Sequence, residues 1–177
     1  NVSYESLKAS IRDIPDYPKP GIVFKDITTL LKDKQAFRLA QQALYDQYKS
    51  ASPDLIAAVE ARGFIFGGAL ANSLGCGFVP MRKPGKLPWP TISESYALEY
   101  GTDSLHMHND AVLKGQKVVL IDDLLATGGT LAAAAKLIEQ AGGVVSGVGV
   151  VIELAFLDGR HRLKDYDVYS VISYDSE

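Results

Sequence analysis

Residues 118–130 read Val118-Val119-Leu120-Ile121-Asp122-Asp123-Leu124-Leu125-Ala126-Thr127-Gly128-Gly129-Thr130. The four apolar residues at the start predict a buried strand, and the Ala-rich segment that follows at 131–140 predicts a helix. A strand, a short turn and a helix in direct succession are typical of α/β proteins, in which helices cover a parallel sheet. Such sheets bind ligands at the carboxyl ends of their strands, so this turn is a candidate binding site.

The same alternation of strands and helices continues on both sides of this stretch. A short helix is predicted at 4–12, a helix capped by Asp33 runs to about Tyr48, and another is predicted at 64–74. We therefore expect a single α/β domain over residues 1–177, with a central parallel sheet flanked by helices. Four further apolar segments predict the remaining strands, at 55–59, 78–81, 144–152 and 168–172.

One segment, from Arg82 to about Leu98, breaks this alternation because it contains Pro84, Pro88 and Pro90. A loop of this length in a compact domain is uncommon, and it is usually either functional or disordered. We predict a long loop that closes over a site and excludes water from it. The alternative is a solvated basic linker.

Composition and charge exclude several classes of function. The net charge is −3 and the Lys and Arg residues are scattered, so the basic stripe of a nucleic-acid-binding protein is missing. No segment reaches the ~18 apolar residues of a membrane helix, and the first ten residues do not have the pattern of a signal peptide. The single cysteine, Cys76, cannot form an internal disulfide. We expect a cytoplasmic protein that binds neither nucleic acid nor a membrane.

The turn at 127–130 has the features of a phosphate site. Free backbone N–H groups at a helix start attract anions, and Gly128 and Gly129 allow the backbone to approach closely. The Lys of a Walker loop and the G-x-G-x-x-G pattern are both missing. Asp122 and Asp123 would repel a phosphate unless they bind something else, and ribose hydroxyls suit them. A sugar 5-phosphate satisfies both halves; the alternative is a plain turn with acids that favour the helix start.

Several segments then resemble one enzyme family. The string from Asp122 to Thr130 resembles the 5-phosphoribosyl 1-diphosphate motif of the type I phosphoribosyltransferases, in the form found in members that use adenine. The resemblance covers about residues 12–155. It implies the type I fold, with a small N-terminal hood at about 1–30 and a flexible loop at about 82–98. Further segments that match, in order, lie at 20–27, 61–67, 82–88 and 95–101.

The resemblance implies a reaction in purine salvage. Adenine and 5-phosphoribosyl 1-diphosphate would give AMP and diphosphate, in a homodimer, with Mg²⁺ bound mainly through the diphosphate of the substrate. Asp122 and Asp123 would hold the ribose. The 5′-phosphate would be held by Ala126, Thr127, Gly128, Gly129 and Thr130.

Basic side chains would neutralise the departing diphosphate. Arg62 follows the strand at 55–59, which places a guanidinium at the ligand-binding edge of the sheet; the alternative is a structural ion pair. By resemblance, the peptide bond before Ala61 is cis. The other candidates are Arg82, Lys83 and Lys86.

The resemblance also assigns the base side of the site. Main-chain groups at Val23 would read the adenine edge, and Phe24 would stack on the ring. Lys25 stands where the family typically has Arg, which leaves its role open because Lys lacks the planar fork of Arg. Glu99 would handle the purine proton, with an exposed strand residue as the alternative, and Tyr100 beside it completes the set of substrate-binding candidates.

Two alternative functions are a transferase of another base, such as hypoxanthine or xanthine, and a ligand-sensing domain that keeps the site without catalysis. The Val23-Phe24 pair disfavours the first, and the lack of a DNA-binding motif disfavours the second. His106 and His108 have a spacing that allows metal binding, but a third ligand is not evident, so we predict no metal site built from protein side chains.

Overall fold

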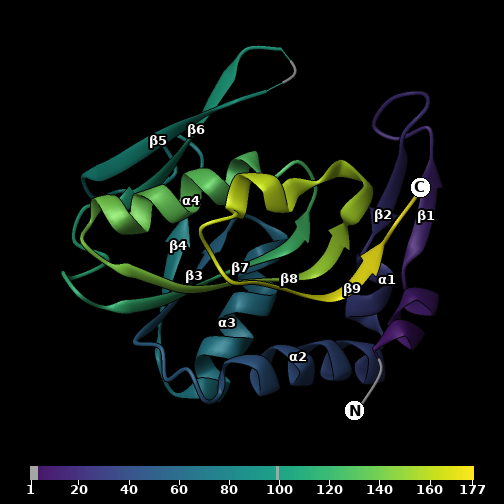
Figure 1. Ribbon diagram of the computed structural model, residues 1–177, viewed down its shortest axis with the longest axis horizontal. Helices are drawn as coiled ribbons and strands as arrows, with labels where there is room; N and C mark the ends of the chain where they lie inside the picture. Colours follow the sequence, from purple (N-terminus) through teal and green to yellow (C-terminus); the bar gives the residue numbers. More distant parts are fainter. Residues whose placement is uncertain (1–3, 99) are drawn as a thin grey trace.

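The computed structural model describes residues 4–98 and 100–177, and its centre is a five-stranded sheet in which all strands are parallel (Figure 1). The predicted α/β architecture is confirmed, and every predicted strand is present. The strand order is β4 (Gly77–Met81), β3 (Leu55–Val59), β7 (Lys117–Leu125), β8 (Val144–Leu154) and β9 (Val168–Tyr174).

Helices cover both faces of the sheet. Helices α2 (Lys34–Tyr48) and α3 (Arg62–Leu74) lie on one face and α4 (Gly129–Gln140) on the other (Figure 1). Asp33 caps α2 as predicted. No helix in the described part of the chain is long and apolar enough to cross a membrane. The shorter segments are α1 (Thr28–Lys32) and the 3-10 helices η1 (Glu5–Ser10), η2 (Ala155–Leu157) and η3 (Gly159–Leu163).

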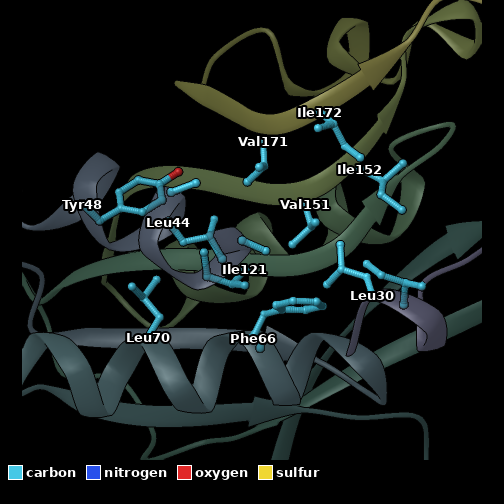
Figure 2. Close-up of a cluster of buried hydrophobic side chains, with 14 of the residues drawn as sticks. Leu30, Leu44, Tyr48, Phe66, Leu70, Ile121, Val151, Ile152, Val171 and Ile172 are labelled. Atoms are coloured by element: carbon cyan, nitrogen blue, oxygen red, sulfur yellow. The ribbon is translucent and has the colours of Figure 1, made fainter. Parts of the chain in front are cut away.

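The strands are apolar on both faces because each face belongs to a separate core. In β3, Ile56 and Ala58 pack in the core under α2 and α3, whereas Ala57 and Val59 pack in the core under α4. All four side chains are buried. Figure 2 shows the first core, in which side chains of the helices meet those of β7, β8 and β9, among them Leu44, Tyr48, Phe66, Leu70, Ile121, Val151 and Ile172.

A two-stranded antiparallel sheet forms the hood near the free edge of β9 (Figure 1). It consists of β1 (Arg12–Pro15) and β2 (Val23–Asp26), with Asp13 opposite Lys25 in the register. The prediction of a helix at 4–12 was wrong at its end, because the helical turn stops at Ser10 and the chain pairs with β2 from Arg12 onwards. The partner strand lies after a run of prolines, so the local pattern did not reveal it.

The predicted loop at 82–98 is wrong in its second half. Residues Thr91–Ala97 form strand β5, which pairs with β6 (Thr102–His108) in an antiparallel hairpin that projects beside α4 (Figure 1). Proline occurs only up to Pro90, and beyond it side chains alternate between more and less exposed positions, as in a half-buried strand. Within 82–98, the segment 82–90 and Leu98 are irregular, apart from one bridge between Arg82 and His106.

Candidate active site

The turn between β7 and α4 encloses a cavity of about 100 Å³ at the carboxyl edge of the sheet. Residues 126–130, called here the glycine turn, line it together with Asp122. Helix α4 begins at Gly129, directly after Gly128, whose φ is 89°. The first N–H groups of a helix lack intrahelical partners, and the helix dipole adds partial positive charge there. The cavity therefore suits a phosphate group.

The glycine turn is backed by η3. A Cβ built on Gly128 would lie 2.5 Å from the carbonyl oxygen of Gly159 in η3. An ion pair holds this segment, since the buried carboxylate of Glu153 accepts hydrogen bonds from Arg160 Nε (2.8 Å) and Ser170 Oγ (2.9 Å). Burial alone would raise the pKa of Glu153, but these two hydrogen bonds lower it. Glu153 is therefore ionised at neutral pH and fixes η3 behind the turn.

Gly128→Ala is expected to disrupt the glycine turn. The left-handed backbone costs an L-residue about 1–2 kcal/mol, and the added methyl group also meets the Gly159 carbonyl. We expect a lower melting temperature and a strong increase in KM for the sugar 5-phosphate that the sequence predicts as substrate. Gly115→Ala is the matched control, because Gly115 has φ 84° with no atom within 4 Å of the added Cβ. It should lower the melting temperature without changing KM; equal KM values for both variants would contradict this role of the turn.

The acid pair lies beside the turn and contacts α3. Asp123 is buried and accepts a hydrogen bond from Arg62 Nε at 2.6 Å, while Asp122 Oδ1 accepts one from the N–H of Asp123 at 2.8 Å. Burial and the neighbouring charge of Asp123 raise the pKa of Asp122. A Cβ on Gly63 would lie 2.8 Å from Asp122 Oδ1, so only glycine lets α3 come this close. The Nη atoms of Arg62 make no hydrogen bond to the described residues and stay available for an anion.

A second cavity of about 240 Å³ continues from the acid pair to the hood. It shares Asp122 and Thr130 with the phosphate cavity, and Phe24 of β2 lies in its wall. The ring of Phe24 contacts Tyr17 edge-on, with the ring centroids 5.2 Å apart. The guanidinium carbon of Arg62 lies 6.0 Å from the centroid of the same ring. Along the two adjoining cavities, the Phe24 ring, the acid pair and the glycine turn follow one another in that order.

Glu60, directly after β3, connects the end of this strand to the basic residues Arg82 and Lys83. Its Oε1 accepts hydrogen bonds from the N–H of Lys83 at 2.7 Å and from Arg82 Nε at 3.3 Å. The peptide bond from Glu60 to Ala61 is cis, as the resemblance implied. Lys83 Nζ pairs with Asp103 Oδ2 at 2.5 Å and also contacts the hydroxyl of Tyr96, both in the β5–β6 hairpin. Burial opposes the charged form of Lys83, but these partners raise its pKa, so it remains a cation.

Comparison with known proteins assigns this arrangement to a family. The phosphoribosyl transferase domain matches residues 26–176. An adenine phosphoribosyltransferase from Thermoanaerobacter sp. (strain X514) is 57% identical over 98% of this chain and 100% of its own length. The chain belongs to the adenine phosphoribosyltransferases. This family assignment confirms the resemblance seen in the sequence.

Solved adenine phosphoribosyltransferases have the same fold. The crystal structure of the enzyme from Thermoanaerobacter pseudethanolicus gives a TM-score of 0.94 at 57% identity, with coverage of 97% of this chain and 100% of that chain. The enzyme from Saccharomyces cerevisiae, crystallised with adenine and an imino-altritol bisphosphate, gives 0.91 at 36% identity, with coverage of 96% and 98%. The predicted type I phosphoribosyltransferase fold is therefore confirmed.

The adenine phosphoribosyltransferase fold brings most of the predicted substrate-binding residues to the two cavities. Tyr100 is not among them, since it is 85% exposed and lines neither cavity. Val23, Arg82 and Lys86 also lie outside the cavity walls. Glu99 lies outside the described residues. The predicted residues in the walls are Phe24, Lys25, Arg62, Lys83, Asp122, Asp123, Ala126, Thr127, Gly128, Gly129 and Thr130.

Three polar residues of this adenine phosphoribosyltransferase site were missed in the sequence. Glu60 lies two residues before Arg62 and directly follows strand β3, so its position at the sheet edge was a usable signal. Asp103 and Tyr96 reach Lys83 only because β5 and β6 pair. Nothing in their local sequence indicates that contact.

Proposed function

We propose that this protein transfers the 5-phosphoribosyl group from 5-phosphoribosyl 1-diphosphate to adenine, giving AMP and diphosphate in purine salvage. The proposal is supported by the order in which three groups line the joined cavities: first Phe24, then the acid pair, then the glycine turn. A nucleoside monophosphate has its base, ribose hydroxyls and phosphate in that order. Val23 would offer main-chain groups to the adenine edge, next to the Phe24 ring.

Asp122 and Asp123 would accept hydrogen bonds from the ribose 2′- and 3′-hydroxyls, and residues 126–130 would hold the 5′-phosphate. Asp123 is held in place by its ion pair with Arg62, whereas burial and the neighbouring charge of Asp123 raise the pKa of Asp122. A protonated Asp122 would still bond a hydroxyl, because a carboxylic acid both donates and accepts. The pair would thus bind the sugar in either protonation state of Asp122.

Asp122→Asn and Asp123→Asn are each expected to lower kcat/KM for the diphosphate sugar by about tenfold or more, since each hydrogen bond to a charged group contributes roughly 1.5–3 kcal/mol. The amide keeps the shape, so the fold should be retained, as circular dichroism would check. Asp110→Asn, at an exposed turn after β6, is the matched control and should leave kcat/KM unchanged. Full activity of both site variants at subsaturating diphosphate sugar would refute the ribose assignment.

Arg62 and Lys83 would neutralise the departing diphosphate, with Arg82, Lys86 and Tyr100 approaching once substrate is bound. Arg62 is already oriented by Asp123, and both Nη atoms are available to an anion. Lys83 would exchange Asp103 for diphosphate oxygens. A magnesium ion fits this site, since carboxylates stand at the rim of a phosphate cavity. Asp122 and Asp123 would face the ion, which would be held mainly by diphosphate and water and would reduce the negative charge on the leaving group.

The chemical step would break the bond between C1′ of the ribose and the diphosphate oxygen and form a bond between C1′ and N9 of adenine. The diphosphate leaves with the electron pair, and the proton of the adenine imidazole passes to a base, for which we propose Glu99. A positively charged sugar develops between these events, and the hood together with the irregular segment 82–90 would exclude water from it. Catalysis then rests on positioning and on electrostatic stabilisation.

The test is a diphosphate-release assay with the purified chain. We expect diphosphate to appear only when adenine, 5-phosphoribosyl 1-diphosphate and Mg²⁺ are all present, with AMP formed in equal amount. A transferase of another base would release diphosphate with hypoxanthine or xanthine instead, and a sensing domain would bind the diphosphate sugar without release. The homodimer and the cytoplasmic location belong to the same proposal; a mass from light scattering that equals one chain would contradict the dimer.

A further inference from the structure

Lys25 borders the second cavity next to Phe24, but its ammonium group lies on the opposite face of β2. Successive residues of a strand face opposite sides, so Phe24 turns toward Arg62 and Lys25 turns to the other face of the hood. There Lys25 Nζ donates a hydrogen bond to Asp13 Oδ1 at 2.8 Å, directly across the β1–β2 pair. The Lys25 side chain is only 4% exposed, against 58% for Asp13. A lysine so deeply buried is held in one position by its partners.

The second partner of Lys25 is Tyr174 at the end of β9. The Lys25 ammonium lies 4.4 Å from the centroid of the Tyr174 ring, and the ammonium of Lys8 lies 4.7 Å from the same centroid. Both distances are those of cation–π contacts. Strand β9 is part of the central sheet, whereas β2 belongs to the hood (Figure 1). Lys25 therefore joins the hood to the sheet that carries the rest of the site.

A tether of this kind matters because a two-stranded hairpin alone is at most marginally stable. The described ion pairs across the hood are Arg12 to Asp26 and Lys25 to Asp13, and both lie within the hairpin itself. Only the second of these cations also reaches the central sheet, through the Tyr174 ring. Removal of the Lys25 charge should therefore loosen the position of β2 relative to the acid pair.

We propose that Lys25 is a positioning residue for the base. Through its contacts with Asp13 and Tyr174, it fixes the position of β2 relative to the central sheet. The position of β2 in turn determines where adenine is held relative to the sugar. The inference rests on the proposed function, in which β2 supplies the main-chain contacts to adenine. It gives the side chain at this position a role on the face of β2 opposite the Phe24 ring. It also gives the last strand of the chain a role in base binding.

The test compares Lys25→Met with Lys25→Arg. Met keeps the length and apolar stem of Lys, and the Asp13 carboxylate that it leaves unpaired is 58% exposed, so no unpaired charge is left buried. We expect KM for adenine to rise by roughly tenfold to a hundredfold, because small displacements of a reactant are costly. KM for the diphosphate sugar should change little. Arg is expected to restore KM for adenine, because it can pair with Asp13 and stack on Tyr174. Lys49→Met, which removes an exposed pair with Asp46, is the matched control.

Two further variants address the partners of Lys25. Asp13→Asn and Tyr174→Leu should each raise KM for adenine selectively, and Tyr174→Phe should do so less than Tyr174→Leu because it keeps the ring. The positioning role would be overturned if KM for adenine and KM for the diphosphate sugar changed equally, or if KM for adenine did not change in Lys25→Met. In both cases the wild-type enzyme would still make AMP. Failure of the proposed function is a separate outcome, since the wild-type chain would then not use adenine at all.

Discussion

Adenine is expected to be used in preference to hypoxanthine and guanine by a factor of about 10⁴ in kcat/KM, because a site built to pair one hydrogen-bonding edge rejects another strongly. Adenine carries an amino group at position 6, which donates to a main-chain carbonyl, and an unprotonated N1, which accepts from an N–H. A 6-oxo purine reverses both groups. The carbonyl would then face an oxygen, and the N–H of the protein would face the N1 proton of the base.

The measurement is kcat/KM for each base at a saturating concentration of the diphosphate sugar, with diphosphate release as the readout. Phe24→Leu leaves the main-chain groups in place, so the discrimination should persist in this variant even though overall affinity for the base falls. That variant is the control for stacking as opposed to edge recognition. Turnover of hypoxanthine comparable to that of adenine would rule out an adenine-specific hood.

Glu99→Gln is expected to lower turnover by roughly 10²–10⁴-fold, the usual contribution of a positioned acid or base. If adenine attacks through N9, its proton starts on N7 and must leave as the new bond forms. A carboxylate near N7 would stabilise the growing positive charge and accept that proton. Gln keeps the shape without the proton-accepting charge, and Glu99→Leu also loses the hydrogen bond, so Leu should be worse than Gln.

Binding and turnover separate this role from a purely structural one. Both Glu99 variants should bind the diphosphate sugar almost normally, as titration calorimetry would measure. If Glu99 only braces the loop, Gln should resemble the wild type and any defect should appear as weaker substrate binding. A Gln variant with unchanged turnover, measured where chemistry limits the rate, would remove Glu99 from the mechanism.

Much of this architecture was predictable because the sequence determines it locally. The strand, glycine turn and helix at 118–140 form one continuous segment, and each step has a signal within a few residues. The position of Arg62 at the sheet edge followed in the same way from the strand just before it. Where a site residue directly follows a parallel strand, topology alone brings it to the ligand.

The remaining features depend on contacts between distant parts of the chain. The ion pair of Arg62 with Asp123 joins residues 61 positions apart, and strand β5 becomes a strand only by pairing with β6. The burial of Lys25 depends on Tyr174, at the other end of the chain. Residue type alone does not predict this burial, because lysine is almost never fully buried unless paired. No periodic pattern in a single sequence reports such pairings.

The segment η3, packed behind the glycine turn, has a consequence for how tightly phosphate can bind. A flexible loop loses conformational freedom when it closes around a ligand, and that loss weakens the observed affinity. Here Gly128 packs against the Gly159 carbonyl, and Glu153 anchors η3 through Arg160, so we expect the turn to be ordered before any ligand arrives. The entropy of ordering the turn is lost when the chain folds. Phosphate therefore meets donors already in place, and its binding should be accompanied by little change in amide hydrogen exchange at residues 126–130.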